Sequence, residues 1–137
     1  MFYYAKLQKE DDAFIVTFPD LPNINTYGEN LEDALKNAEE ALNGSLESDF
    51  ERGFKFIKPK NYKGEEFYKI YLHPHIVVSY NLRQIRADKS QIDIAKKLGI
   101  SYQAYQKLEN PRKCNPTVKT LEKIAKIFDK ELELVFK

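Results

Sequence analysis

Carboxylate and imidazole side chains are the groups in this 137-residue chain that could support catalysis or bind a metal. Paired carboxylates can hold Mg²⁺ ions for phosphodiester hydrolysis, but Asp11, Asp12 and Asp20 fall in turn-like segments that nothing in the sequence brings together. His73 and His75 flank a proline, and two histidines alone make a poor metal site. The chain contains no glycine-rich phosphate loop, nucleophile elbow or Cys-x-x-Cys motif. We therefore expect no catalytic residues, no metal and no cofactor.

A different chemistry, hydrogen bonding to bases, is available in the segment SQIDIAKKLGISYQAYQKLENPRKCNPTVKTL, which begins at Ser90. Ser90 and Ser101 can each cap a helix, and Gly99 between them can take the positive φ of a tight turn. The second of these helices is predicted to run from Tyr102 to about Glu109. The first carries apolar residues at near-helical spacing, namely Ile92, Ile94, Ala95 and Leu98.

Two further helices complete the predicted set of this half of the chain. One runs from about Ile76 to Arg86, and another begins at Asn115-Pro116, a cap followed by proline at the first helical position. The apolar residues of these two helices are Val77, Tyr80, Leu82, Ile85, Val118, Leu121, Ile124, Ala125 and Phe128. Four short helices are enough for a small all-α domain.

The succession of cap, Ala95, Gly99, Ile100 and second cap resembles the helix-turn-helix of phage repressors. In that motif the start of the second helix enters the major groove of DNA, where glutamine pairs with adenine and lysine with guanine. The resemblance implies contacts to DNA from Gln91, Ser101, Tyr102, Gln103, Gln106, Lys107, Arg112 and Lys113. It also implies that Tyr105 and Leu108 face the core and that Glu109 is structural. A four-helix core without a DNA role is the alternative.

The charge is divided unevenly along the chain, whose net charge is +1. Residues 1–72 contain 9 Lys/Arg and 14 Asp/Glu, a net charge of −5, whereas residues 73–137 contain 13 and 7, a net charge of +6. A cationic half is suited to phosphate contact, and an anionic half, which DNA would repel, is suited to a basic protein partner. Ordinary scatter of solvated charge is the alternative. We expect two domains, residues 1–72 and 73–137.

The composition is that of a folded protein, with 42% hydrophobic residues and 18 Tyr and Phe. No run of about 18 apolar residues is present, so no membrane span is expected, and the early charges argue against a signal peptide. A single cysteine, Cys114, fits a reducing bacterial cytoplasm. Its neighbour Lys113 could lower the pKa of the thiol, but the sequence favours an ordinary loop thiol.

The first half of the chain predicts a sheet covered by one helix. Residues 2–7 and 13–18 predict a hairpin with a polar turn, residues 24–27 a short third strand, and residues 67–72 another, with a further short strand possible at 54–57. Asn30 can cap a long helix. That helix carries one apolar stripe, formed by Leu31, Ala34, Leu35, Ala38, Ala41, Leu42 and Leu46. His73-Pro74-His75 is expected to link the two domains.

These segments carry a specific series: Phe14-x-Val16-x-Phe18-Pro19-Asp20-Leu21-Pro22, Thr26-x-Gly28-x-x-Leu31-x-x-Ala34, Asn37-Ala38 and Ala41-Leu42. The series resembles the HicB antitoxin family, and with the helix-turn-helix the resemblance extends over nearly the whole chain. Asn23 replaces the usual glycine of the family, and asparagine tolerates positive φ. The resemblance implies an α+β fold: a small antiparallel sheet on one long helix, partially RNase H-like, followed by an all-α helix-turn-helix domain.

The HicB resemblance also implies partners. Such antitoxins bind HicA, a small basic ribonuclease that cleaves mRNA, mask its active site and repress their own operon. An acidic, aromatic domain would complement a cationic RNA-binding surface. We expect toxin contacts from Tyr3, Asp11, Asp12, Phe18, Asp20, Glu29, Glu32, Glu39 and Glu40, although the acids could simply form a solvated face.

Two questions of function stay open at the level of sequence. The chain could be a stand-alone DNA-binding regulator whose first domain senses a small ligand or another partner. Repressors of this kind usually bind two half-sites as dimers, so a homodimer or higher homo-oligomer is expected. Leu132-x-Leu134-x-Phe136 alternates as a strand does, and could pair across a two-fold axis or cover the core of its own subunit.

Overall fold

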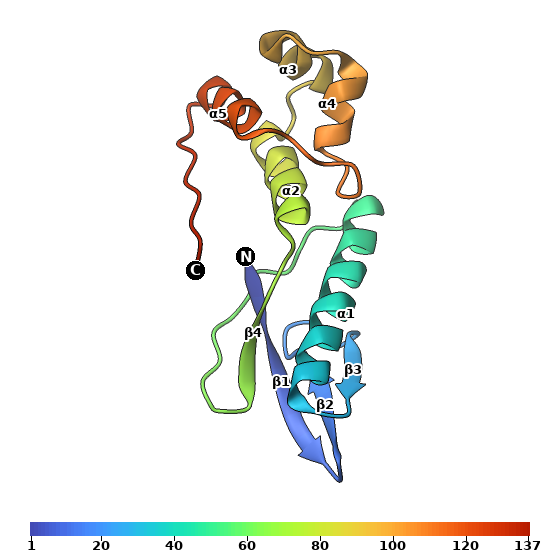
Figure 1. Cartoon of the computed structure of the whole chain (residues 1–137). Helices are drawn as coiled ribbons and strands as arrows, with labels where there is room; N and C mark the ends of the chain where they lie inside the picture. The colour runs from blue at the N-terminus through green and yellow to red at the C-terminus, as the bar shows by residue number, and fades with distance from the viewer. The chain divides into compact units, whose positions relative to one another are not determined.

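The computed structural model describes all residues from 1 to 137, and they form two compact units, Met1–Pro74 and His75–Lys137 (Figure 1). The first, here the sheet unit, contains four strands and one long helix. The second, here the helical unit, contains the remaining helices, of which the first begins at Pro74. His73–His75 is therefore not an extended linker, because the helix begins within it. The predicted α+β class is confirmed.

The sheet is antiparallel throughout, with strand order β3-β2-β1-β4. Its strands are β1 (Phe2–Glu10), β2 (Ala13–Thr17), β3 (Asn25–Gly28) and β4 (Phe67–Tyr71). The predicted hairpin is present, and Asp11 at its turn has a φ of 54°. The strand considered for residues 54–57 does not form. Nor does Asn23 adopt positive φ, so the loop does not depend on that property of asparagine.

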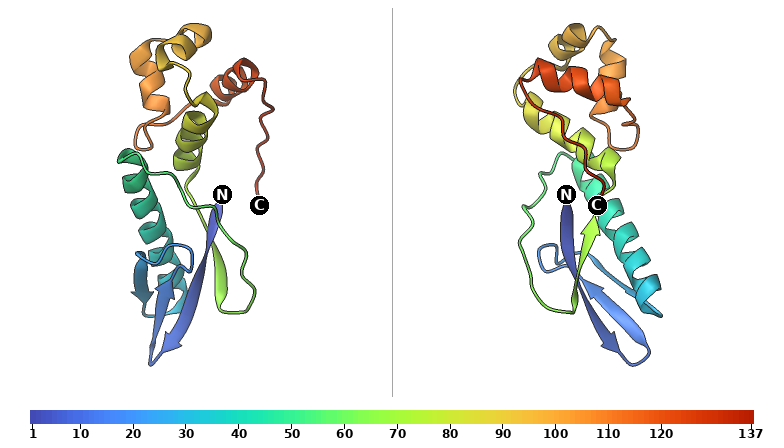
Figure 2. Two further views of the ribbon diagram at one scale, coloured as in Figure 1. Left: turned by 180° about the vertical axis from the view of Figure 1, so that it is seen from behind. Right: turned by 60° about the vertical axis from the view of Figure 1, so that its left-hand side comes forward.

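Helix α1 (Leu31–Glu51) lies along one face of the sheet (Figures 1 and 2). Asn30 caps it as predicted, since the side-chain oxygen accepts from the backbone N–H of Asp33 at 2.8 Å. The predicted stripe is buried except at its margins, where Leu31 is exposed and Leu35 and Ala41 are half-buried. The core between helix and sheet contains Tyr3, Ala5, Leu7, Val16 and Ile70 from the strands and Ala34, Ala38, Leu42, Leu46 and Phe50 from α1.

Two polar or small residues fix how α1 meets the sheet. Gly28 lies so close to the first turn of α1 that an added Cβ would be 2.2 Å from the backbone nitrogen of Ala34. Asn43 is buried on α1, where its amide donates to the carbonyl of Tyr71 at 3.2 Å and its oxygen accepts from the N–H of His73 at 2.7 Å. The helix is thereby tied to both edge strands.

The opposite face of the sheet is aromatic. Alternation along β1 and β4 places Phe2, Tyr4, Phe67 and Tyr71 on this face, away from α1. Tyr62, from the loop between α1 and β4, stacks on Phe67 with ring centroids 5.2 Å apart and meets Tyr4 edge-on at 6.1 Å. The loop is therefore packed onto the sheet through one tyrosine.

The helical unit is built from α2 (Pro74–Arg86), α3 (Gln91–Leu98), α4 (Tyr102–Leu108) and α5 (Val118–Ile127). Ser90 and Ser101 cap α3 and α4 as predicted. The predicted start of α5 is wrong, because Thr117 caps that helix, accepting from the N–H of Thr120 at 3.1 Å. The core contains Leu82, Ile94, Ala95, Tyr105, Leu108, Ile124 and Phe128.

Three details of the predicted helical core are corrected. Ile92 is 47% exposed, because it lies in the first turn of α3 on the solvent side. On α2 the fully buried residues are Ile76, Ser79 and Leu82, while Val77 and Tyr80 are half-buried. The segment after α5 forms no strand and leaves Phe136 fully exposed, so it does not cover the core of its own unit.

Candidate functional site

The turn between α3 and α4 is set by Gly99 and the two flanking caps. Gly99 has a φ of 72°, in the left-handed region, and its N–H bonds to the carbonyl of Lys96. Ile100 follows, with its N–H on the carbonyl of Ala95 at 3.1 Å and its side chain against the core. The chain then enters α4 directly at Ser101. Local hydrogen bonds thereby define the turn between the two short helices.

A buried carboxylate joins these two helices to α2. Glu109, which follows α4, is only 2% exposed. Its two oxygens accept from Arg86 Nε at 2.6 Å and Arg86 Nη2 at 2.9 Å, and Gln91 Nε2 donates to it at 3.2 Å. Burial alone would raise the pKa of Glu109, but the hydrogen bonds, first of all those from Arg86, outweigh burial and hold that pKa below its usual value.

The role of Glu109 could be predicted from the sequence, but its ion-pair partner could not. A structural role for Glu109 was expected, but its partner Arg86 was not identified, because the two residues are 23 positions apart and no spacing rule connects them. Gln91, predicted to contact a phosphate, is half-buried and gives one amide hydrogen to Glu109. An amide has a second hydrogen, so a phosphate contact is still compatible with this position.

Apart from Gln91, the residues predicted to meet DNA lie on α4, at its cap and in the following loop. All of the side chains in this set are exposed: Ser101, Tyr102, Gln103, Gln106, Lys107, Arg112 and Lys113. Tyr105 and Leu108, on the opposite side of the same helix, are buried. Helix α4 therefore presents amide, hydroxyl and ammonium groups outward while an apolar side anchors it. That is the chemical set that reads base edges and phosphates in a major groove.

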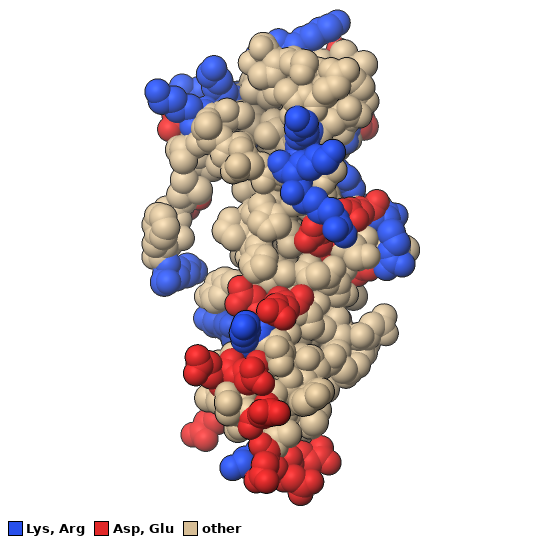
Figure 3. Space-filling view, turned by 45° about the vertical axis from the view of Figure 1, so that its right-hand side comes forward, with Lys and Arg blue, Asp and Glu red and all other residues tan.

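The acids of the sheet unit divide into surface and structural groups. Asp11, Asp12, Glu29, Glu32, Glu39 and Glu40 are exposed. Figure 3 shows Asp and Glu side chains gathered mainly on the sheet unit and Lys and Arg side chains mainly on the helical unit. Glu39 lies 3.0 Å from Nε2 of His73, an ion pair when the imidazole is protonated.

Three of the residues predicted to contact a toxin have structural positions instead. Tyr3 and Phe18 are buried in the core, so as surface contacts these two predictions are wrong. Asp20 is half-buried and accepts from the N–H of Lys60 at 2.9 Å and the hydroxyl of Tyr62 at 2.7 Å, which raises the pKa of Tyr62. Its carboxylate holds the loop between α1 and β4 onto the sheet.

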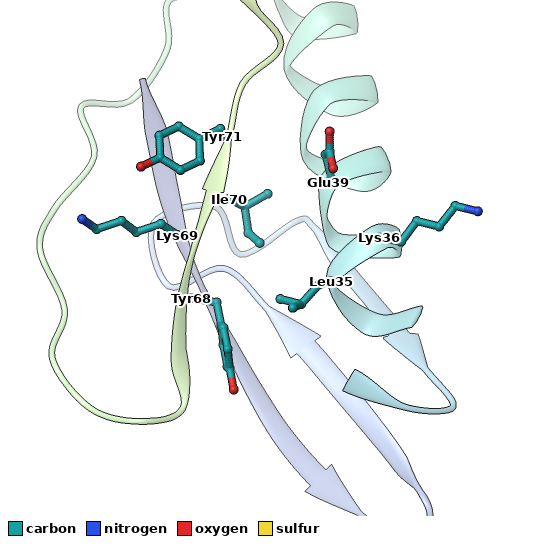
Figure 4. Close-up of a pocket in the computed structure, with 7 residues that line it drawn as sticks. All are labelled: Leu35, Lys36, Glu39, Tyr68, Lys69, Ile70 and Tyr71. Carbon is teal, nitrogen blue, oxygen red and sulfur yellow. The ribbon is translucent and has the colours of Figure 1, made fainter. Parts of the chain in front are cut away.

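A groove runs between α1 and the edge strand β4 (Figure 4). It has a volume of about 450 Å³ and is lined by Leu35, Lys36, Glu39, Tyr68, Lys69, Ile70 and Tyr71. In the antiparallel pairing with β1, alternate residues of β4 turn their backbone groups away from β1. The groove therefore combines an apolar floor, charged rims and a strand edge, which suits it to an extended peptide.

The reactive groups outside the groove include one thiol and one further imidazole. Cys114 is buried, and burial raises the pKa of its thiol to about 11, so Lys113 does not activate it. His75 Nδ1 lies 2.7 Å from the carbonyl oxygen of Pro111. No group of three or more His, Cys, Asp and Glu side chains placed to hold a metal ion occurs. None of the helices is both long and apolar enough to cross a membrane.

Comparison with known proteins identifies the sheet unit. Residues 2–73, more than half of the chain, match the family model described as HicB_like antitoxin of bacterial toxin-antitoxin system. The chain belongs to the HicB-like antitoxin family. Residues 80–135 match the helix-turn-helix family model, so this HicB-like antitoxin also has a DNA-binding role. The predicted family and DNA-binding motif are both confirmed.

Solved HicB structures are similar to this chain in part. The N-terminal domain of Burkholderia pseudomallei antitoxin HicB is 26% identical over 53% of this chain and 99% of that one, with a TM-score of 0.49. The longer structure of antitoxin HicB from the same organism is 20% identical over 77% of this chain and 90% of that one, with a TM-score of 0.48. No curated protein sequence matches significantly.

Proposed function

We propose that this chain is the antitoxin of a type II HicAB toxin–antitoxin system. It binds and neutralises a HicA-like, mRNA-cleaving toxin and represses its own operon by binding operator DNA. The main support for the proposal is that one chain contains both a HicB-like unit of net charge −5 and a helix-turn-helix unit of net charge +6. The anionic unit attracts a basic toxin and the cationic unit attracts DNA.

On the toxin side, the exposed carboxylates are the residues that we expect to make contact. A ribonuclease binds its substrate through cationic side chains, and a surface rich in carboxylates can occupy the same positions as the phosphates of the mRNA. Glu39 lies at the rim of the groove beside β4. There its carboxylate could pair with a cationic side chain of a toxin segment that binds along the groove. Glu32 and Glu40 are also exposed on α1.

The test of toxin binding is co-expression with the small basic protein encoded beside the gene, followed by affinity purification and a growth assay. We expect a stable complex and rescue of growth. Reversal of both charges in Glu32→Lys/Glu40→Lys should weaken the complex about tenfold, whereas Glu122→Lys, an exposed acid of the helical unit, should not. Absence of both a complex and toxicity would refute the proposal.

On the DNA side, Gln103 and Lys107 are expected to have different roles. Gln103→Ala should relax base preference, because an amide pairs with one base edge in two hydrogen bonds. Lys107→Ala should weaken binding across sequences and lower the slope of log affinity against log salt by about 1. Lys123→Ala on α5 is the matched control, since it is exposed but outside α4. If neither Gln103→Ala nor Lys107→Ala changes operator binding, α4 is not the recognition helix.

Binding to an operator also has consequences for assembly and location. Two half-sites about one helical turn apart require two copies of the recognition helix, so we expect a homodimer or a higher homo-oligomer. An antitoxin that acts on mRNA cleavage and on operator DNA works in the bacterial cytoplasm, where both are present. Equilibrium sedimentation of the purified chain tests the first expectation.

The groove beside β4 is the observation that favours a second candidate function. At about 450 Å³ it is large enough for a small molecule, so the chain could be a stand-alone regulator whose sheet unit senses a ligand. This candidate shares the DNA chemistry but has no toxin. A neighbouring reading frame for a small basic protein favours the antitoxin, and its absence favours the regulator.

A further inference from the structure

The face of the sheet that α1 leaves uncovered carries a contiguous group of aromatic rings. Phe2 and Tyr4 of β1 meet edge-on with ring centroids 5.4 Å apart, and Phe2 also contacts Tyr71 of β4 at 5.4 Å. Tyr62 and Phe67 join the group through their contacts with Tyr4. None of these five rings, here the aromatic platform, is fully buried, and Tyr71 is 45% exposed. The platform therefore offers ring surface to a flat ligand.

Lysine side chains border the aromatic platform. Lys69 Nζ lies 4.9 Å from the centroid of the Phe2 ring, and Lys6 lies directly opposite Phe67 in the pairing of β1 with β4. Figure 4 shows that Lys69 and Tyr71 both point away from α1. The loop between α1 and β4 adds four exposed lysines: Lys55, Lys58, Lys60 and Lys63. An anionic ligand on the rings would therefore meet ammonium groups from two strands and a loop.

The net charge of the sheet unit is divided between two regions of opposite sign. Residues 1–53, which include α1, contain 4 Lys/Arg and 12 Asp/Glu, a net charge of −8. Residues 54–72 contain 5 Lys/Arg and 2 Asp/Glu, a net charge of +3. The two acids, Glu65 and Glu66, lie in the turn before β4. The first region is suited to a basic protein, whereas the second is complementary to a polyanion.

We propose that the aromatic platform and its bordering lysines bind single-stranded nucleic acid. Unpaired bases stack on tyrosine and phenylalanine rings, while the phosphates of the same strand bind lysine side chains. Aromatic side chains on the open face of a four-stranded sheet are an established way to stack two or three bases. The bases of a duplex are stacked on one another, so operator DNA cannot use these rings and stays with the helical unit.

The loop that carries the lysines is held against the platform before any ligand binds. The carboxylate of Asp20 accepts from the backbone N–H of Lys60 at 2.9 Å and from the hydroxyl of Tyr62 at 2.7 Å. The ring of Tyr62 stacks on Phe67 with an interplanar angle of 25°. Lys60 and Lys63, on either side of Tyr62, are thereby kept near the rings. A bound strand does not have to order this loop, which lowers the entropic cost of binding.

The test is photo-cross-linking of the full chain to a single-stranded oligomer of about 12 nucleotides that carries iodouridine. Mass spectrometry of the cross-linked peptides separates the sheet unit from the helical unit, which is itself cationic. We expect cross-links to aromatic residues of β1 and β4. Cross-links confined to the helical unit, or none, would overturn the proposal. The oligomer is used both as RNA and as DNA; cross-linking of either to these strands supports the proposal, and the tighter one identifies the preferred sugar.

The affinity of this face is measured from the concentration dependence of cross-linking to β1. Tyr71→Ala should weaken binding about tenfold, because a stacked base loses its ring. The matched control is Tyr68→Ala, since Tyr68 lies on the same strand but faces the α1 side, opposite the buried Ala5. Equal affinities for the two variants would contradict stacking on the platform. Displacement of the oligomer by polyglutamate as effectively as by unlabelled RNA would show that the face binds an acidic protein segment instead.

The phosphate contacts are tested through the salt dependence of the same cross-linking. Lys60→Ala/Lys63→Ala should lower the slope of log affinity against log salt by about 1.4, because each phosphate contact to a single strand contributes about 0.7. An unchanged slope would show that these lysines bind no phosphate. Toxin co-purification should be unchanged in this double variant, whose residues lie outside the acidic set and the groove. Loss of nucleic-acid binding is thereby distinguished from failure of the antitoxin function.

Discussion

Replacement of Glu109 by glutamine should destabilise the helical unit more than any other conservative change of a charged residue in it. The carboxylate is 2% exposed and receives hydrogen bonds from Arg86 at 2.6 and 2.9 Å and from Gln91 at 3.2 Å. Removal of one partner of a buried ion pair costs about 3–5 kcal/mol. Arg86 retains some exposure, at 16% of its side chain, so we expect the lower end, about 3 kcal/mol.

The assay is differential scanning calorimetry of the full chain, with hydrogen exchange of α3 and α4 to identify the unit that melts. For a domain of this size each kcal/mol lowers Tm by about 4–8 °C, so Glu109→Gln should lower the Tm of the helical unit by about 12–24 °C at pH 7. Glu122→Gln, an exposed acid on α5, is the control and should change little.

The same network predicts a pH dependence with a definite sign. The hydrogen bonds hold the pKa of Glu109 below the 4.5 of an ordinary glutamate. The stabilisation is therefore complete at a pH above about 4.5 and is lost as the pH falls through the lower value of the folded state. The Tm difference between wild type and Glu109→Gln should shrink in that acid range. A variant that melts within about 3 °C of wild type at pH 7 would show that the carboxylate does not hold the helices together.

Two further predictions concern the sheet unit and the single thiol. Gly28→Ala should destabilise the sheet unit by about 1–3 kcal/mol, because the new Cβ would lie 2.2 Å from the backbone nitrogen of Ala34. The control is Gly44→Ala, whose new Cβ meets nothing within 4 Å and which should be neutral or stabilising. Equal Tm values for the two variants would contradict the close approach of Gly28 to α1. Cys114, with a pKa of about 11 and little exposure, should react with iodoacetamide at pH 7.5 at least about tenfold more slowly than free cysteine, and rapid alkylation would contradict its burial.

The helices that carry the candidate DNA-binding residues could be predicted from the sequence because their determinants are local. A serine cap accepts from an N–H two or three residues ahead, and Gly99 supplies a positive φ at one position. With these features fixed, the spacing along α4 alone separates the buried Tyr105 and Leu108 from the exposed polar set. The buried partner of Glu109 could not be found in the same way, because Arg86 comes from another helix.

The sheet unit shows the limit of sequence reasoning most clearly. The four strands that form, the cap at Asn30 and the apolar stripe of α1 all follow from short-range pattern, whereas the strand considered at 54–57 is absent. Alternation in the aromatic strand β1 shows that Tyr3 and Tyr4 point to opposite faces, but not which face α1 covers. The tertiary structure decided that Tyr3 is core and that Asp20 holds a loop 40 residues away. Hydrogen bonds between near neighbours depend on local residue types, so the sequence by itself determined the helices and strands. Burial depends on contacts between distant segments. Only the tertiary packing therefore decided which side chains are exposed to a binding partner.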